Sequence, residues 1–199
     1  MADEIVCGHA TVKEARTRLP RIEHDFYPTA EALTQALLQV VSISGTVLEP
    51  CAGDGAIAQL FPNCHTNDLH TQRWDHQLDA TLPESWEQFA ACEWVVTNPP
   101  FNRAPQILPH AYTHVQVGVA FLLRLSYLEP CADRSEWLKT HADRMTHVIV
   151  LNPRPKFRSD SRGGDNVTTA WFVWQRDFSW QERGLDCPFH FANWSTSTE

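Results

Sequence analysis

Residues 46–55 read Thr-Val-Leu-Glu-Pro-Cys-Ala-Gly-Asp-Gly and decide the fold. The apolar start predicts a short strand, the two glycines predict a tight turn, and residues 56–60 are expected to form a brief helix. A strand that runs into a glycine turn and then a helix is how α/β proteins open a nucleotide site. The stretch therefore predicts an α/β fold with a ligand site at this turn.

Strands and helices alternate along the rest of the chain. Strands are predicted at 64–67, 94–97, 117–124, 147–151 and 167–174, and helices at 107–115 and 136–142. This alternation favours a mostly parallel sheet covered on both faces, and the last two strands, which no helix separates, predict an antiparallel pair at one edge. A first helix is expected to start at Pro28 and Thr29, with Thr29 as its N-cap and Leu33, Leu37, Val40 and Val41 on one face.

Length and composition limit the possible classes. With 199 residues and a charged fraction of 20%, the chain fits one soluble domain. It has neither an apolar run long enough for a membrane span nor a signal-peptide layout, so we expect a cytoplasmic protein. The six cysteines and ten histidines show no metal-ligand spacing, so no metal is expected. A net charge of −8 disfavours indiscriminate polyanion binding but permits a nucleic-acid substrate if basic residues gather on one face.

The glycine turn carries carboxylates rather than phosphate-binding residues. No Lys-Ser or Lys-Thr follows the glycines, which excludes a triphosphate loop, and Ala58 stands where a dinucleotide motif has its third glycine. Glu49 and Asp54 would repel a pyrophosphate and suit a ligand with a cationic end, such as an amino acid or a sulfonium. The alternative is an ordinary strand-to-helix turn.

Asp68 follows Glu49 by 19 residues and ends the next predicted strand. An acidic side chain at this place commonly binds ribose hydroxyls. A surface aspartate that caps a turn is the alternative.

Asn98-Pro99-Pro100-Phe101 follows the apolar strand at 94–97. The two prolines fix the backbone and remove its amide donors, so the Asn98 side-chain carbonyl and the Pro99 carbonyl can both face one amino group. Phe101 supplies a flat apolar surface beside them. A simple turn is disfavoured because the tetrapeptide follows a buried strand.

Together these motifs resemble the amino-methyltransferase branch of the class I S-adenosyl-methionine-dependent enzymes. Residues 49–55 are similar to the cofactor loop of N6-adenine DNA methyltransferases, and residues 25–29, Asp-Phe-Tyr-Pro-Thr, are similar to the segment before it. Residues 123–129 and 152–157 resemble small phage and prophage adenine methyltransferases. The resemblance covers about residues 24–175. It implies a Rossmann-like class I methyltransferase domain with a mostly parallel seven-stranded sheet, an antiparallel edge strand and helices on both faces.

The resemblance also implies roles for individual residues. Phe26, Tyr27 and Thr29 would border the methionine part of S-adenosyl-L-methionine, Glu49, Ala52, Gly53 and Gly55 would form the floor below it, Asp68 would hold the ribose, and Asp79 would sit at the adenine. Pro28, Pro50, Leu69 and Ala80 would belong to the same cofactor site. Asn98 and Pro99, on the loop that Pro100 helps to fix, would hold the target amino group, and Phe101 would stack on the target base.

The chain has little room for target recognition. Residues 1–24 are expected to form an arm, and 25–199 a single catalytic domain, because only 18 residues separate Asp79 from Asn98 and no separate recognition domain fits. DNA would then be read by loops, with short or relaxed specificity, or by a homodimer that shares the reading. The candidate nucleic-acid loop holds Arg154, Lys156, Arg158 and Arg162 within nine residues, and a solvated hairpin loop is its alternative.

Three alternative functions remain open from the sequence. The nearest is N6-adenine methylation of structured RNA. Glutamine methylation of release factors uses a similar tetrapeptide, but usually with tyrosine as its fourth residue and with an extra helical domain. A cofactor-binding subunit without catalysis would not need Asn98 to Phe101 intact.

Overall fold

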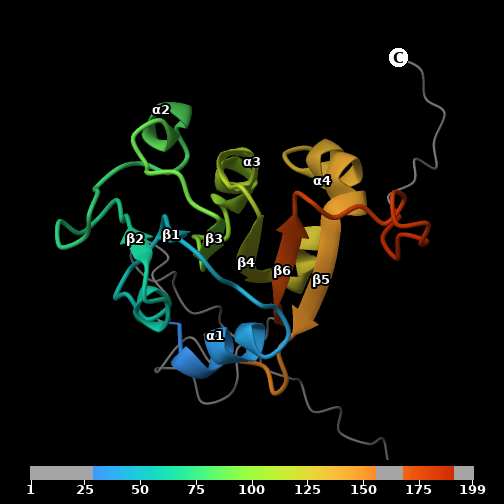
Figure 1. Ribbon diagram of the computed structural model, residues 1–199, viewed down its shortest axis with the longest axis horizontal. Helices are drawn as coiled ribbons and strands as arrows, with labels where there is room; N and C mark the ends of the chain where they lie inside the picture. Colours follow the sequence, from blue (N-terminus) through green and yellow to red (C-terminus); the bar gives the residue numbers. More distant parts are fainter. Residues whose placement is uncertain (1–28, 156–167, 191–199) are drawn as a thin grey trace, which may run out of the picture.

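The computed structural model describes residues 29–155 and 168–190 (Figure 1). The expected arm at 1–24 and the cofactor residues Phe26, Tyr27 and Pro28 lie outside the described residues, as do Lys156, Arg158 and Arg162. The α-helices are α1 (Glu31–Leu38), α2 (Pro83–Trp86), α3 (Ala104–His114) and α4 (Ser135–His141), and the short 3-10 helices are η2 (Ala58–Leu60), η3 (Leu125–Leu128) and η4 (Ala142–Arg144). The strands are β1 (Val47–Glu49), β2 (Cys64–Thr66), β3 (Trp94–Thr97), β4 (Gly118–Arg124), β5 (Met145–Val150) and β6 (Thr169–Gln175).

The strands form a mixed sheet in the order β2-β1-β3-β4-β6-β5. β2, β1, β3 and β4 are parallel, and β6 is antiparallel to both β4 and β5. The predicted antiparallel strand is therefore present, but it lies one strand in from the edge. The described residues contain six strands where seven were predicted. One parallel bridge, Asn67 with His76, lies beside β2 in the place of a seventh.

Successive residues of the strands pack on opposite faces of the sheet, as the pleat requires. On one face Val95, Phe121 and Phe172 join a core with α3 and α4, and on the other Trp94, Val96 and Trp171 join a core with α1. Figure 1 shows α2, α3 and α4 above the sheet and α1 below it. Helices on both faces are thus confirmed.

The first helix differs from its prediction. It begins at Glu31, its N-cap is Ala30, and no side-chain hydrogen bond caps it, so the expected capping by Thr29 is wrong. The predicted apolar face is only partly right, because Val40 lies beyond the helix end and is 52% exposed. The helix is tied to the sheet by the Trp171 indole, which donates to the Leu33 carbonyl at 2.7 Å.

The topology brings the carboxyl ends of five strands to one end of the sheet, here called the site edge. β1, β2, β3 and β4 are parallel, so their carboxyl ends lie together there. β5 also ends at this edge, because it is antiparallel to β6, which is antiparallel to β4. The segment that leaves β5 toward Arg154 therefore starts at the same edge as the glycine turn. Among the described helices, none combines the length and apolar character needed to cross a bilayer.

Candidate active site

A cavity of about 900 Å³ lies at the carboxyl ends of β1, β2 and β3. Of the residues predicted to form the site, Thr29, Glu49, Pro50, Ala52, Gly53, Asp68, Leu69, Asp79, Ala80, Asn98, Pro99 and Pro100 line it. Gly55 and Phe101 do not line this cavity. One cavity is thus lined by three segments that local sequence patterns predicted: the glycine turn, the end of β2 and the tetrapeptide.

Glu49 ends β1 and points its carboxyl into the fold. It is 2% exposed, and its Oε2 accepts a hydrogen bond from the Ala58 amide at 2.7 Å. Burial raises the pKa of Glu49 well above its usual value, and the neighbouring Asp54 and Asp68 carboxylates raise it further, although the Ala58 bond lowers it. A buried carboxyl in this state is stabilised as a carboxylate by a cation that enters the cavity.

Asp68 braces the glycine turn. One carboxylate oxygen accepts the Gly53 amide at 2.9 Å, and the other accepts the His70 amide at 2.8 Å. Each carboxylate oxygen can accept a further hydrogen bond, so this arrangement leaves acceptor capacity toward the cavity that Asp68 lines.

Asn67 links two walls of the cavity, although no sequence pattern predicted it as a residue of the site. The side chain is fully buried, and its Nδ2 donates to the Pro50 carbonyl at 2.9 Å and to the Leu78 carbonyl at 3.0 Å. Its Oδ1 accepts the Leu78 amide at 2.8 Å. The residue therefore ties the start of the glycine turn to the chain just before Asp79. The only local signal was its position beside Asp68 at a strand end.

Asp79 forms a closed turn with Thr81. Its Oδ1 accepts the Thr81 hydroxyl at 2.7 Å and the Thr81 amide at 2.9 Å. These bonds, the hydroxyl's above all, hold the pKa of Asp79 below its usual value. The carboxylate is thus kept ionised at the wall of the cavity.

Gly55 has a different role from the predicted one. Its φ of +84° suits glycine, and a Cβ there would lie 2.5 Å from the Trp74 ring. The close neighbour of this glycine is therefore a tryptophan and not the cavity. The Trp74 indole donates to the Gly53 carbonyl at 3.1 Å, and the Arg73 guanidinium stacks on Trp74 at 4.2 Å and donates to the Asp54 carbonyl.

Asn98 is held by Thr29. The Asn98 Nδ2 donates to the Thr29 hydroxyl at 3.0 Å, across 69 positions of sequence. Because the amide is planar, this bond fixes where the Oδ1 on its other arm lies. Thr29 was predicted to cap a helix and to border the cofactor. It lines the cavity and also orients the asparagine.

Phe101 faces a second, smaller cavity of about 180 Å³. The Arg124 guanidinium lies over the Phe101 ring, 4.9 Å from its centroid. Asn102 lines both cavities, so the two are neighbours.

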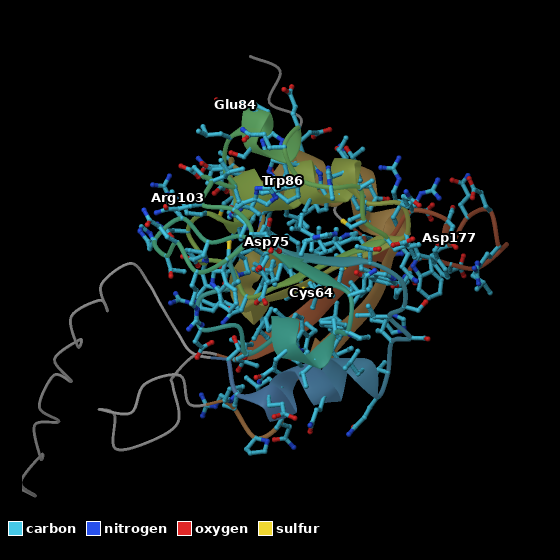
Figure 2. The ribbon with its side chains drawn as sticks, turned by 60° about the vertical axis from the view of Figure 1, so that its left-hand side comes forward. Cys64, Asp75, Glu84, Trp86, Arg103 and Asp177 are labelled. Carbon is cyan, nitrogen blue, oxygen red and sulfur yellow. The ribbon has the colours of Figure 1, made fainter. Side chains whose placement is uncertain are left out.

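Basic residues of the site come from more places than the predicted loop. Arg154 is exposed and follows β5 at the site edge, whereas the other three predicted basic residues lie outside the described chain. Arg73 and Arg103, which the sequence reading did not select, line the large cavity. Figure 2 shows Arg103, at the large cavity, on the opposite side of the molecule from Asp177, which belongs to the chain that follows β6. No group of three or more His, Cys, Asp or Glu with metal-binding geometry occurs among the described residues.

Comparison with known proteins identifies the fold. No family model and no curated protein matches the sequence. The type I restriction enzyme EcoKI M protein is similar in structure, with a TM-score of 0.60 and 14% identity over 75% of this chain and 44% of that one. TrmN from Thermus thermophilus gives a TM-score of 0.52 and 20% identity, with 73% and 48% covered. A dimethyladenosine transferase from Plasmodium falciparum gives 0.51 and 12%, with 73% and 61% covered.

The chain thus spans about half the length of these solved proteins. TM-scores of 0.51 to 0.60 at these identities indicate a likeness of fold. The chain therefore has the Rossmann-like fold of the class I S-adenosyl-methionine-dependent methyltransferases.

Proposed function

We propose that this protein is an S-adenosyl-methionine-dependent methyltransferase that methylates the exocyclic N6 of adenine in DNA, with short or relaxed sequence specificity. The observation that carries the proposal is Asn98, held by Thr29 at the wall of an acidic cavity. The structural likeness to a restriction-enzyme M protein and to a dimethyladenosine transferase supports it.

The large cavity suits S-adenosyl-methionine by size and by charge. Four carboxylates, those of Glu49, Asp54, Asp68 and Asp79, line it. The cofactor has a sulfonium and an ammonium group, and both are cations that these carboxylates attract. We assign Glu49 to the cationic methionine end, Asp68 to the ribose, and Leu69, Asp79 and Ala80 to the adenine. Bound there, the cofactor supplies a methyl group that its sulfonium has already activated.

Asn98 and Pro99 prepare the nucleophile. The N6 lone pair of adenine is delocalised into the ring and attacks poorly. The Asn98 Oδ1 and the Pro99 carbonyl accept the two amino hydrogens, which favours a tetrahedral nitrogen and frees the lone pair. The cofactor held at Glu49, Asp68 and Asp79 would supply the methyl group and keep the electron pair of the C–S bond, and the methylated nitrogen would lose its extra proton to water. Alignment of the three atoms supplies most of the rate, and a strong base is not needed.

The adenine reaches this site only outside the base stack. Rotating it out of a duplex costs about a few kcal/mol, which a single strand does not require. We therefore expect single-stranded DNA to be methylated at least as well as duplex DNA of the same sequence.

Transfer of labelled methyl groups to duplex DNA, single-stranded DNA, transfer RNA and ribosomal RNA, followed by nucleoside analysis, tests the proposal. We expect N6-methyl-2′-deoxyadenosine as the product. A product on RNA alone would contradict the DNA assignment and favour the RNA enzyme. Asn98→Ala is expected to lose turnover and to keep cofactor affinity, and a loss of cofactor binding instead would show that Asn98 belongs to the cofactor site only.

A further inference from the structure

The second cavity differs in charge from the first, where four acidic side chains outnumber the two arginines Arg73 and Arg103. Two guanidinium groups, of Arg124 and Arg134, line it together with the Phe101 and Tyr127 rings, and no acidic residue among the described ones lines it. Asp133 pairs with Arg134 at 3.3 Å but is not part of the wall. The cavity beside the four carboxylates thus carries positive charge.

Arg134 is fixed in this wall. Its Nε donates to the Tyr127 carbonyl at 2.8 Å and its Nη2 to the Ser126 carbonyl at 3.2 Å, while the guanidinium lies over the Tyr127 ring at 5.1 Å. The side chain is 15% exposed. Backbone carbonyls orient this arginine, and Asp133 offsets part of its charge from outside the wall of the cavity. Arg124 is therefore the main source of positive charge in the cavity.

Arg124 is placed differently. It is exposed at the end of β4, its guanidinium lies over Phe101, and among the described residues it forms no salt bridge. A guanidinium with free donors offers planar, bidentate recognition of a phosphate. Its contact with Phe101 puts those donors next to the tetrapeptide.

We infer that the second cavity binds a backbone phosphate of the nucleic-acid strand next to the target nucleotide, with Arg124 as the main contact. This inference rests on the proposed function, since it assigns the base to the side of Asn98 and its phosphate to the side of Arg124. Asn102, which lines both cavities, marks the junction where the nucleotide would pass from one to the other. The cationic cofactor is thereby directed to the cavity with the acidic side chains, and the anionic strand to the cavity with the arginines.

Arg124→Gln tests the inference, with binding measured on a labelled 12-nucleotide strand of thymidine that contains one central adenosine. The probe has one possible target, so its flanking phosphates are known. Each phosphate contact to a single strand contributes a slope of about −0.7 to the dependence of log K on log salt. We expect Arg124→Gln to lose about this slope, so that its defect shrinks about 2.6-fold between 50 and 200 mM salt. Arg124→Lys is expected to retain the slope.

Arg183→Gln is the matched control. Arg183 is also exposed and also lies over a phenylalanine, Phe178, at 4.4 Å, but it belongs to the chain that follows β6, away from the site edge. Its replacement is expected to leave the slope unchanged. Thermal unfolding and cofactor affinity of Arg124→Gln are expected to equal those of the unmodified protein.

A neutral methylphosphonate beside the adenosine locates the contact. It is expected to weaken binding by the unmodified protein and to have little further effect on Arg124→Gln. Equal weakening of both proteins, or an unchanged slope in Arg124→Gln, would overturn the inference. The same strands also serve as substrates for methyl transfer. If the salt slope depends on Arg124 but no methylation occurs, only the proposed function is contradicted. If methylation occurs but Arg124→Gln leaves the salt slope unchanged, only the phosphate site is contradicted. A uridine strand with one adenosine distinguishes RNA from DNA in both measurements.

Discussion

At the scale of single residues, the proposed catalysis depends on how Asn98 is oriented. The bond from its Nδ2 to the Thr29 hydroxyl decides which arm of the amide can accept from the substrate. With the Nδ2 directed at Thr29, the Oδ1 is the arm that can accept the amino hydrogens of the substrate. Thr29 is thus a positioning residue for the proposed chemistry.

Thr29→Val keeps the shape of this side chain and removes its hydroxyl. We expect kcat to fall by about 10-fold to 100-fold, because misplacement of a positioned group by about 1 Å costs that much. Thr29→Ser, which keeps the hydroxyl, is expected to retain most of the rate. Steady-state kinetics with saturating cofactor measure both variants, and an unchanged kcat in Thr29→Val would show that Asn98 is oriented by other contacts.

Glu49 makes cofactor binding depend on pH. In the free protein burial raises the pKa of its carboxyl, with Asp54 and Asp68 adding to the effect. Cationic groups of the cofactor favour the carboxylate, so binding releases a proton when the pH lies below this raised pKa. Affinity is therefore expected to increase with pH and to level off above the pKa of the free protein. Calorimetry in buffers of different ionisation enthalpy measures the released proton, and Glu49→Gln is expected to abolish it.

The same raised pKa affects the stability of the free protein. The folded protein binds this proton more tightly than the unfolded chain, so Glu49 contributes most stability below the unfolded pKa of about 4.3 and loses it as the pH rises through the folded pKa. The cofactor-induced rise in melting temperature should consequently be larger at higher pH. A rise that is independent of pH would contradict this role of Glu49.

At the scale of elements, the glycine turn is supported from outside by the segment that follows β2. Trp74 covers Gly55 and bonds to the Gly53 carbonyl, and Arg73 adds a second bond across the turn. The turn is thereby shaped before any ligand arrives, which lowers the conformational entropy lost on binding.

Gly55→Ala tests this support, and Gly184→Ala is its matched control. Both glycines have positive φ, +84° and +66°, but a Cβ at Gly184 meets nothing within 4 Å. In the control, the free energy of unfolding should fall only by the cost of placing alanine in a left-handed backbone conformation, about 1 kcal/mol. In Gly55→Ala the free energy of unfolding should fall by about 3 kcal/mol, because the clash with Trp74 adds an overpacking cost. Urea unfolding measures both, and equal losses would show that Trp74 moves aside freely.

Sequence patterns predicted those elements whose signal is local. The apolar run of β3 was predicted with its observed bounds, and β4 to within one residue, because buried parallel strands are continuously apolar. α2 was missed because four residues carry no helical period. The glycine turn and the tetrapeptide were also recognisable locally. The roles of Thr29, Asn67 and Trp74 were not, because each depends on partners that only the folded chain brings near.

At the scale of the whole molecule, charge is segregated rather than uniform. The chain has a net charge of −8, yet Arg103, Arg124 and Arg154 are exposed at or next to the edge that holds the cavities. Local positive charge at this edge would supply the phosphate contacts of the proposed function despite the acidic total. Arg154 follows β5 at this same edge, and phosphate contact by Arg154, Lys156, Arg158 and Arg162 stays a prediction with a solvated hairpin loop as its alternative.

Replacement of Arg154, Lys156, Arg158 and Arg162 by glutamine measures what this loop contributes. If all four contact duplex phosphates, the salt slope of binding should fall by about 3.6, at about 0.9 for each contact. Cofactor affinity is expected to stay unchanged, since Arg154, the residue of the four that the structure describes, does not line the large cavity. Binding of a labelled duplex at four salt concentrations gives the slope. A slope equal to that of the unmodified protein would show that the loop is only solvated.

The bridge between Asn67 and His76 has a consequence for how the molecule behaves in a crowded solution. β2 is an edge strand only three residues long, and two of its backbone groups are bonded to the segment beside it. The Thr66 amide donates to the Asp75 carboxylate at 2.8 Å, and the Thr66 carbonyl accepts from the His76 amide at 3.2 Å. Occupied donors and acceptors leave less of an edge strand open to a strand from another chain. The short segment that lies in the place of a seventh strand thus makes the β2 edge a poorer template for edge-to-edge pairing at Thr66.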